Sequence, residues 1–320
     1  MPGKITVPLH TAWTGTPRQA SNGEAPDICL PTDYRALFAN RTILITGVGR
    51  SGTTILGKIL GSMKRCYYVF EPAILKYLAA AGTESLLGTL AEDYCIPLVQ
   101  GRGNANPLDW SYQGNYLDVA EIERRRKVLR RREDAMKFIE DEQSIWVFKL
   151  PEYQPWIPFI RTHIPGIKIV DVIRDGREVV RSFMERGWYN DDYCDNRAIE
   201  WSRRDFMGKI PAFVGSESRG DWPRWNVGTR GACVWRTLTT HSVINSPDIK
   251  VRYETFIREP SIISDGIRRN LGLENSELSL KHIASVKNHK HEDKPEFPID
   301  SISEPERFRF LNALHDMGYE

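Results

Sequence analysis

The sequence predicts an α/β fold of three layers, in which helices flank a central parallel sheet. Three observations support this prediction. Short apolar runs typical of buried strands alternate with longer helical segments. A glycine-containing turn joins the first of these strands to a helix, and charged residues directly follow several of the strands. Ligands of such sheets bind outside the carboxyl ends of the strands, so the charged residues indicate where to expect the site.

The expected elements follow an irregular, proline-containing arm at residues 1–40. Strands are predicted, in chain order, at residues 43–46, 67–70, 145–148, 168–173 and 249–251. The helices between them include a long charged one over residues 117–142 and another over residues 231–246. Residues 183–230 lack clean periodicity and are predicted to be an insertion that acts as a lid or binds a ligand. Residues 41–320 are expected to form a single domain that carries this insertion.

Composition excludes several classes of function. The 320 residues are 41% hydrophobic and 27% charged, which is ordinary for a soluble globular protein. A net charge of +2 gives no global reason to expect nucleic acid or a membrane as partner. Seven basic residues at 124–132 have acidic residues on both sides, at 121, 123, 133 and 134, which favours a solvated helix face with ion pairs over a nucleic-acid site.

The cysteines and the chain terminus predict a cytoplasmic location. The five cysteines are scattered and form no C-x-x-C pair, so they indicate free thiols in a reducing compartment. The N-terminal residues lack the apolar core of a secretory signal, and no apolar run is long enough to span a membrane. No compact set of histidine, cysteine and carboxylate ligands is present, so no metal is expected.

The segment ILITGVGRSGTTIL, residues 43–56, carries the strongest functional signal. It predicts a strand, a turn and a helix whose backbone N–H groups hold an anion. The ATP-binding form of this loop is G-x-x-x-x-G-K-[ST]. Gly47 and Gly52 keep that spacing and Thr54 fills the hydroxyl position, but Thr53 replaces the lysine and the cation is Arg50. The loop is therefore expected to bind a phosphate-linked donor other than a nucleoside triphosphate.

A second motif follows the fourth predicted strand. Arg174 opens the segment R-D-G-R, and Ser182 lies eight residues later in the following helix. An arginine at the end of a strand and a serine two turns into the next helix can converge on one phosphate. The guanidinium supplies paired planar donors, and the hydroxyl adds another.

Together, the G-x-x-R-S-G-T-T loop and the R-D-G-R-x-x-x-x-S segment resemble the sulfotransferases that use 3′-phosphoadenosine 5′-phosphosulfate (PAPS). The resemblance covers residues 43–72 and 145–186, and continues weakly into V-R-Y-E at 251–254. It implies a P-loop NTPase-like sulfotransferase fold and release of the desulfated product, PAP. The Arg-Ser-Gly start of the loop is closer to tyrosylprotein and carbohydrate sulfotransferases than to the cytosolic phenol sulfotransferases.

The resemblance also implies roles for individual residues. Glu71 lies 21 residues beyond Arg50, as does the catalytic glutamate of tyrosylprotein sulfotransferases, and would be the general base. Lys149 lies close to the position of the family's catalytic lysine, and with Arg50 would stabilise charge on the leaving group. The residues expected to bind the donor are Arg50, Ser51, Gly52, Thr53, Thr54, Arg174, Ser182 and Tyr253. A carboxylate that simply ends a strand remains the alternative for Glu71, and a half-buried core tyrosine the alternative for Tyr253.

The acceptor is expected to be a small molecule with a hydroxyl or an amine or guanidinium nitrogen. Trp188, Tyr189, Asp191 and Asp192 lie in the insertion, where aromatic and acidic side chains would suit a cationic acceptor. The same residues would also fit core aromatics beside an exposed acidic loop. Two other functions stay open, namely a P-loop kinase or other NTP-dependent enzyme, and a nucleotide-binding regulatory protein without transfer activity. Thr53 in place of the lysine argues against the first.

Overall fold

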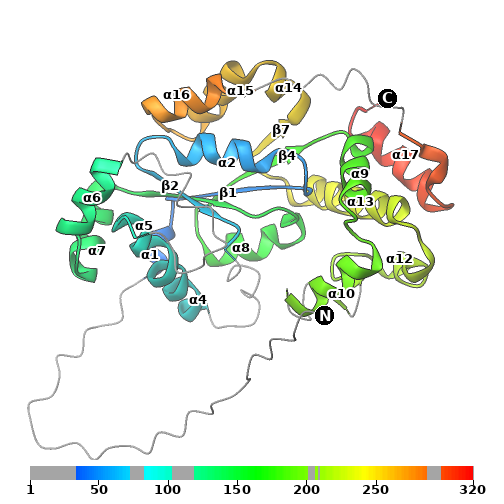
Figure 1. Cartoon of the computed structure of the whole chain (residues 1–320), viewed down its shortest axis with the longest axis horizontal. Helices are drawn as coiled ribbons and strands as arrows, with labels where there is room; N and C mark the ends of the chain where they lie inside the picture. The colour runs from blue at the N-terminus through cyan, green and yellow to red at the C-terminus, as the bar shows by residue number, and fades with distance from the viewer. Residues whose placement is uncertain are drawn as a thin grey trace, which may run out of the picture. The chain divides into compact units, whose positions relative to one another are not determined.

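The structure is a computed structural model that describes residues 34–72, 83–102, 119–200, 206–207, 210–286 and 297–319. Within these ranges five strands form a parallel sheet in the order β2-β3-β1-β4-β7 (Figure 1). Their bounds are β1 Thr42–Gly47, β2 Cys66–Phe70, β3 Ile145–Lys149, β4 Lys168–Ile173 and β7 Ile249–Arg252. The predicted α/β class is confirmed. Every predicted strand is present, and no strand end differs from its predicted position by more than one residue.

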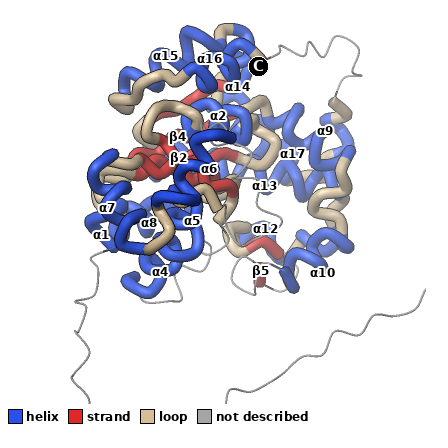
Figure 2. Tube along the Cα trace, turned by 60° about the vertical axis from the view of Figure 1, so that its left-hand side comes forward, coloured by secondary structure: helices blue, strands red, loops and turns tan. Residues whose placement is uncertain are grey.

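Alternation along β1 explains why the sheet is covered on both faces. All six residues of β1 are buried, as is usual for a central parallel strand. Leu44 packs on one face with Trp146 and Phe148, whereas Ile43 and Ile45 pack on the other. Because successive side chains point to opposite faces, both faces need a helical layer. Figure 2 shows the strands between these two layers.

Among the described helices, four cover the face that carries Ile43 and Ile45 (Figure 1). They are α2 Thr53–Gly61, α14 Tyr253–Arg258, α15 Pro260–Asn270 and α16 Glu277–Ala284. Helix α2 approaches β2 closely because Gly57 and Gly61 face Tyr68. A Cβ atom at either glycine would lie within 2.5 Å of the tyrosine side chain. This close contact packs α2 against β2.

The elements of the other face share two apolar clusters. One cluster contains Phe38, Trp146 and Ile160, and the other contains Phe183, Trp235 and Phe310. The elements that contribute, in chain order, are α1 Tyr34–Phe38, α4 Thr83–Leu90, the π-helix η1 Ala91–Cys95, α5 Ile96–Val99, α7 Arg132–Glu142, η3 Gln154–Trp156, α8 Ile157–His163, α9 Gly176–Glu185, α10 Asp191–Glu200, β6 Ile210–Pro211, η4 Trp222–Arg224, α13 Val227–Asn245, η5 Ile299–Ser301 and α17 Glu306–Asp316.

The predicted long helix over residues 117–142 is two helices, α6 Val119–Val128 and α7. The chain leaves the helix where Leu129 turns into the core and Arg131 takes an extended conformation before α7. The expected solvated face is also interrupted, because Arg125 is buried. Its guanidinium donates to Glu121 and to the hydroxyl of Tyr67, which ties α6 to β2.

Two further expectations differ from the structure. The predicted irregular arm of residues 1–40 lies mostly outside the described residues, but its last part forms α1, with Leu37 and Phe38 buried. Helix α13 begins at Val227, four residues before the predicted start, because the side chain of Asn226 caps it by accepting from Thr229 N at 2.8 Å. Residues 206–226 also contain the short pair β5 Phe206–Met207 and β6, and the helical turn α12 Ser216–Arg219.

Candidate active site

A cleft of about 660 Å³ lies at the carboxyl ends of the parallel strands, where the sequence predicted a site. The described residues that line it come from the ends of β1 to β4, the turn after α9, the start of α14, and helices α2 and α16 with the residue that follows α16. They are Gly49, Arg50, Gly52, Thr53, Thr54, Ile55, Lys58, Phe70, Glu71, Lys149, Pro151, Arg174, Trp188, Tyr253, His282 and Ser285. Most of the residues expected to bind a donor or to act in catalysis therefore share one cavity.

The loop between β1 and α2 has the geometry of an anion cradle. Gly52 adopts φ +90°, and a Cβ atom there would lie 2.4 Å from the ring of Tyr253. Gly52 provides no side-chain cap for α2, so the first N–H groups of this helix are left for a ligand. The Oγ atom of Ser51 is buried and has no partner among the described residues. Orphaned donors at a helix N-terminus suit a phosphate, so the loop fits a phosphate-bearing donor.

The two sequence motifs meet beside this cradle. Arg50 Nε donates to Ser182 Oγ at 3.1 Å, although the two residues are 132 positions apart. Arg174 Nη1 donates to the carbonyl oxygen of Arg50 at 2.9 Å. The pKa of Arg50 is lowered by burial and then by the neighbouring Arg186 and Arg174. Cations that lie close enough to lower the pKa of Arg50 favour the binding of an anion between them.

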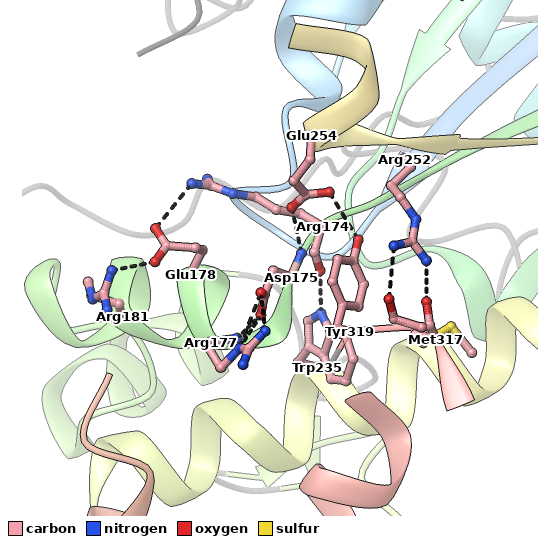
Figure 3. A network of polar contacts seen from close by, with 11 residues as sticks. Arg174, Asp175, Arg177, Glu178, Arg181, Trp235, Arg252, Glu254, Met317 and Tyr319 are labelled. Atoms are coloured by element: carbon pink, nitrogen blue, oxygen red, sulfur yellow. Dashed lines mark hydrogen bonds and ion pairs between the residues drawn. The ribbon is translucent and has the colours of Figure 1, made fainter. Parts of the chain in front are cut away.

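A hydrogen-bond network positions Arg174 at the end of β4 (Figure 3). Trp235 Nε1 donates to the carbonyl oxygen of Arg174 at 3.0 Å. One oxygen of Glu254 accepts from the backbone N–H of Asp175 at 2.9 Å, and its other oxygen accepts from the hydroxyl of Tyr319 at 3.1 Å. Residues from β4, α13, α14 and the C-terminal segment thus hold one strand end.

Tyr253 forms the wall between the loop and Arg174. Its ring covers Gly52, and the Arg174 guanidinium lies 4.7 Å from the ring centroid. Arg174 also lies 3.6 Å from Glu178, which pairs in turn with Arg181. Tyr253 therefore lines the cleft as the sequence expected, and it supports Arg174 through a cation–π contact.

Glu71 and Lys149 form an ion pair at the ends of neighbouring strands. Phe70 pairs with Lys149 in the register of β2 and β3, and Glu71 N donates to the carbonyl oxygen of Lys149 at 2.8 Å. Burial lowers the pKa of Lys149, and the carboxylate of Glu71 opposes this effect. Glu71 has φ +44°, a left-handed conformation that is costly for a residue with a side chain. Both side chains reach the cleft beside the loop.

The predicted acceptor residues divide into two groups. Trp188 lines the cleft. Tyr189 is buried behind it, and its hydroxyl donates to Glu152 Oε1 at 2.9 Å. Asp191 pairs with Arg230 at 2.8 Å, and Asp192 is exposed at the start of α10. None of the last three lines the cleft in the part of the chain that the structure describes.

The sequence reasoning did not identify Lys58, His282 and Ser285, which also line the cleft. Lys58 lies one helical turn after Thr54 on α2, so helical periodicity could have indicated it. His282 and Ser285 are on α16, more than 220 residues from the loop, and no local signal marks them. Their position results from the packing of α16 on α2.

The described residues contain no group of three or more histidine, cysteine or acidic side chains that could hold a metal ion. Among the described residues that line the cleft, the basic ones other than histidine are Arg50, Lys58, Lys149 and Arg174. Among the described helices, none has both the length and the apolar character that a membrane span requires.

Comparison with known proteins identifies a family. A family model described as "Sulfotransferase family" matches residues 42–277. No curated protein sequence gives a significant match. Similar solved structures include a sulfotransferase domain of the Synechococcus PCC 7002 olefin synthase, 15% identical with a TM-score of 0.46, which covers 88% of this chain and 96% of that one. Others are a sulfotransferase domain from the curacin biosynthetic pathway (13% identical, TM-score 0.47, covering 87% and 97%) and a sulfotransferase from Mycobacterium avium (12%, 0.44, covering 88% and 78%).

Proposed function

This chain belongs to the sulfotransferase family, and from that membership we propose that it transfers a sulfuryl group from PAPS to a small-molecule acceptor. The observation that carries the proposal is the convergence of two cationic motifs on one cleft. The loop after β1 and Arg174 after β4 lie beside each other, as shown by the hydrogen bond from Arg174 to Arg50. A donor with phosphate at both its 5′ and 3′ positions matches that pair of sites.

The donor set fits the two ends of PAPS. The free N–H groups at the start of α2, with the hydroxyls of Thr53 and Thr54, suit the 5′-phosphate. Arg174 and Ser182 suit the 3′-phosphate. PAPS would supply a sulfuryl group attached to a phosphate that leaves as a stable anion. The residues of this chain then need only to position the donor and to stabilise the charge that develops on the leaving group.

Arg50 and Lys149 are the cations placed for that stabilisation. Both line the cleft beside the loop. Lys149 is 4% exposed, and a buried charge interacts more strongly than one in water. A single preorganised donor of this type typically contributes about 3–4 kcal/mol to lowering a barrier.

Glu71 is the group that would accept the acceptor's proton. Its ion pair with Lys149 holds the carboxylate at the cleft, and its constrained backbone limits other orientations. Glu71 would take the proton from the attacking acceptor, and Lys149 would stabilise the charge on the leaving phosphate. The contact between the two side chains would therefore place the base and the cation beside the same sulfuryl group.

The proposed acceptor carries a hydroxyl, amine or guanidinium group and reaches Glu71 beside Phe70, Pro151 and Trp188. A cationic acceptor would meet the aromatic ring of Trp188 and the carboxylate of Glu71. Asp191 is already paired with Arg230, so it adds little to this attraction. Screening amines, guanidines, phenols and sugars with labelled PAPS would identify the class. Equal rates on neutral and cationic acceptors would argue against a role for charge.

The proposal also includes a reducing cytoplasm as the site of the reaction. In its support, Cys66, Cys95, Cys194 and Cys233 are buried thiols, and none of them is in a disulfide.

The proposal is tested first by calorimetry with PAP and with ATP. We expect PAP to bind at micromolar concentration and ATP, with or without Mg²⁺, at least about tenfold more weakly. The reason is that ATP lacks the 3′-phosphate that Arg174 would bind. Losing this contact lowers the binding free energy by on the order of one charge-assisted hydrogen bond. Tighter binding of ATP would favour an NTP-dependent enzyme instead.

A transfer assay then separates an enzyme from a regulatory protein. With an acceptor from the screen, Glu71→Gln is expected to lower kcat by about 10²–10⁴-fold and to leave PAP binding unchanged. Exposed Glu277, which pairs with Lys281 at 2.7 Å on the outer surface of α16, provides the matched control Glu277→Gln. If PAP binds but no acceptor in the screen gains labelled sulfate, the catalytic proposal fails and a regulatory role is favoured.

A further inference from the structure

A second carboxyl group, that of Glu152, lies close to the ion pair of Glu71 and Lys149. Glu152 follows the end of β3 by three residues, and it is not among the described residues that line the cleft. Its Oε1 atom lies 2.8 Å from the position that a Cβ atom would take at Gly49, which does line the cleft. The carboxyl group therefore lies directly behind the loop between β1 and α2.

Two hydrogen bonds hold Glu152 in this position. Its backbone N–H donates to the carbonyl oxygen of Gly47 at 2.7 Å, which ties the turn after β3 to the end of β1. The hydroxyl of Tyr189, a buried residue, donates to Glu152 Oε1 at 2.9 Å. Glu152 also has φ +63°, a left-handed conformation that persists only where the surrounding structure enforces it. The fold thus fixes both the backbone and the carboxyl group of this residue.

The charge of Glu152 acts on Lys149. Burial lowers the pKa of Lys149, and the carboxylates of Glu71 and, more weakly, Glu152 oppose this effect. The guanidinium of Arg50 repels the ammonium and lowers the same pKa further. The charged groups of the described chain that act on Lys149 are therefore a carboxylate after β2, a carboxylate in the turn after β3, and a guanidinium in the loop after β1.

Glu71 does not keep its charge throughout the proposed reaction. As the acceptor oxygen or nitrogen bonds to sulfur, the bond from sulfur to the bridging oxygen breaks, and its electron pair stays on the leaving phosphate. The acceptor's proton passes to Glu71, whose carboxyl group becomes neutral. The buried ammonium of Lys149 then loses its nearest counter-charge. Burial without a counter-charge favours the neutral form of a lysine.

We propose that Glu152 is a positioning residue of this reaction, and that its carboxylate keeps Lys149 charged while Glu71 carries the acceptor's proton. The inference rests on the proposed function, since it concerns the same base and the same cation. The leaving phosphate also attracts the ammonium, but it departs with PAP, whereas Glu152 stays in place. One carboxylate thus takes the proton, and the other maintains the cation until the first is ionised again.

Two substitutions separate the charge of Glu152 from its hydrogen bond. Glu152→Gln removes the charge, but the amide oxygen can still accept from Tyr189, so a purely structural role predicts little effect. Tyr189→Phe makes the complementary change, since it keeps the charge and removes the hydrogen bond that holds it near Lys149. Glu277→Gln, at an exposed position on α16, is the matched control.

The first measurement follows the titration of Lys149 by NMR and needs neither donor nor acceptor. The full chain is labelled with ¹³C at lysine Cε, and the signal of Lys149 is the one missing from Lys149→Arg. Glu71→Gln is the background, because its neutral side chain reproduces the charge of the protonated base. There we expect Glu152→Gln to lower the midpoint of Lys149 by at least about half a pH unit, and Tyr189→Phe to lower it less. Glu277→Gln should leave it unchanged.

The second measurement is the pH dependence of kcat with an acceptor from the screen. Glu152→Gln should move the alkaline limb of the profile to lower pH by a similar amount. In the Lys149→Arg background, whose cation keeps its proton throughout, the same substitution should leave the shape of the profile unchanged. An equal loss of rate at every pH in both backgrounds would show that Glu152 has a structural role only, and would overturn the inference.

The two measurements separate this inference from the proposed function. If the chain transfers sulfuryl groups but the midpoint of Lys149 does not respond to Glu152→Gln, the inference is overturned and the proposed function stands. If the midpoint responds but no acceptor is sulfated, the proposed function is overturned, and the role of Glu152 in the reaction with it. Should Glu152→Gln fail to fold, Tyr189→Phe decides, since an unchanged midpoint and an unchanged profile in that variant would overturn the inference.

Discussion

At Lys149, burial disfavours the charged form of the side chain, whereas the neighbouring carboxylate favours it. Its side chain is almost fully enclosed, yet its ammonium lies against the carboxylate of Glu71 and 4.5 Å from the centroid of the Phe70 ring. Removing charge from water is costly, so such a group is kept only where partners compensate for it. A cation held in this way is already oriented before a ligand binds.

This placement predicts a kinetic effect without a binding effect. Lys149→Met is expected to lower kcat by about 10²–10³-fold, while the affinity for PAP changes less than about threefold, because charge at the leaving oxygen develops only during transfer. Lys168→Met, at the exposed amino end of β4, is the control. Loss of PAP binding in parallel with kcat would contradict a role confined to the transition state.

The pH profile provides a second readout for Lys149. Burial lowers its pKa, so the charge is lost as pH rises at a lower value than the usual 10.4 or so of an exposed lysine. The unaltered enzyme should therefore lose kcat on the alkaline side below that value. Lys149→Arg keeps its charge throughout and should lose this alkaline limb, whatever its absolute rate.

At this scale the sequence could predict residues whose role depends on a local motif. Arg50 and Thr53 were identifiable because a phosphate loop fixes both spacing and residue type. Glu71 and Lys149 were indicated by family spacing, and the structure adds that they touch. His282 could not be predicted, because a lone histidine on an amphipathic helix carries no signal until the helix packing is known.

Elements were predictable where hydrophobic pattern alone determines them. Strands of a parallel sheet are buried on both faces and appear as short apolar runs, and β4 was placed without error. Breaks within the predicted helices could not be predicted from the same pattern. Nothing in the pattern at Leu129–Arg131 marks a break by glycine or proline, so the division between α6 and α7 depends on tertiary contacts of Leu129 and Arg125.

The contact between β4 and α13 contains a buried carboxyl group, that of Asp171. It accepts from the hydroxyl of Ser242, and its other oxygen lies 3.2 Å from Gln154 Nε2. Complete burial raises its pKa to about 6. The Oε1 atom of Gln154 is buried without a partner among the described residues. Protonated Asp171 could donate to that atom if the amide of Gln154 rotates.

This carboxyl group makes stability depend on pH. The folded state binds the proton more tightly than the unfolded chain, so the contribution of Asp171 is most favourable below pH 4. As pH rises through about 6, this contribution to the free energy of unfolding is lost, and the loss amounts to about 3 kcal/mol. Asp171→Asn should remove that pH dependence and unfold at higher denaturant concentration than the unaltered chain at pH 7.5, by about 1–2 kcal/mol.

Chemical denaturation at pH 4.5 and 7.5 measures both effects. Ser242→Ala provides a variant with the opposite expectation, since it removes a hydrogen bond to the charged carboxylate and should destabilise the chain most at pH 7.5. Exposed Asp192→Asn is the control. A stability difference between Asp171→Asn and the unaltered chain that is independent of pH would contradict the raised pKa.

On the scale of the whole molecule, the site joins parts of the chain that are far apart in sequence. The loop after β1, the end of β4 and the C-terminal segment come together only when the sheet is complete. Arg252 donates to the carbonyl oxygens of Met317 and Gly318, which anchors the last described residues beside β7 (Figure 3). The order of motifs along the chain predicted that Arg50 and Arg174 meet, but the contribution of Tyr319 had no sequence signal.

The C-terminal segment should therefore affect recognition of the 3′-phosphate. Tyr319 donates to Glu254, Glu254 holds the N–H of Asp175, and Asp175 adjoins Arg174. Tyr319→Phe removes the first hydrogen bond, so Arg174 should be held less firmly and PAP should bind about three- to tenfold more weakly. Adenosine 5′-monophosphate lacks the 3′-phosphate, so its affinity should not change, and calorimetry with both nucleotides gives an internal control. An equal loss for the two nucleotides would indicate general destabilisation, and no loss for PAP would show that the end of β4 is held without the C-terminal tyrosine.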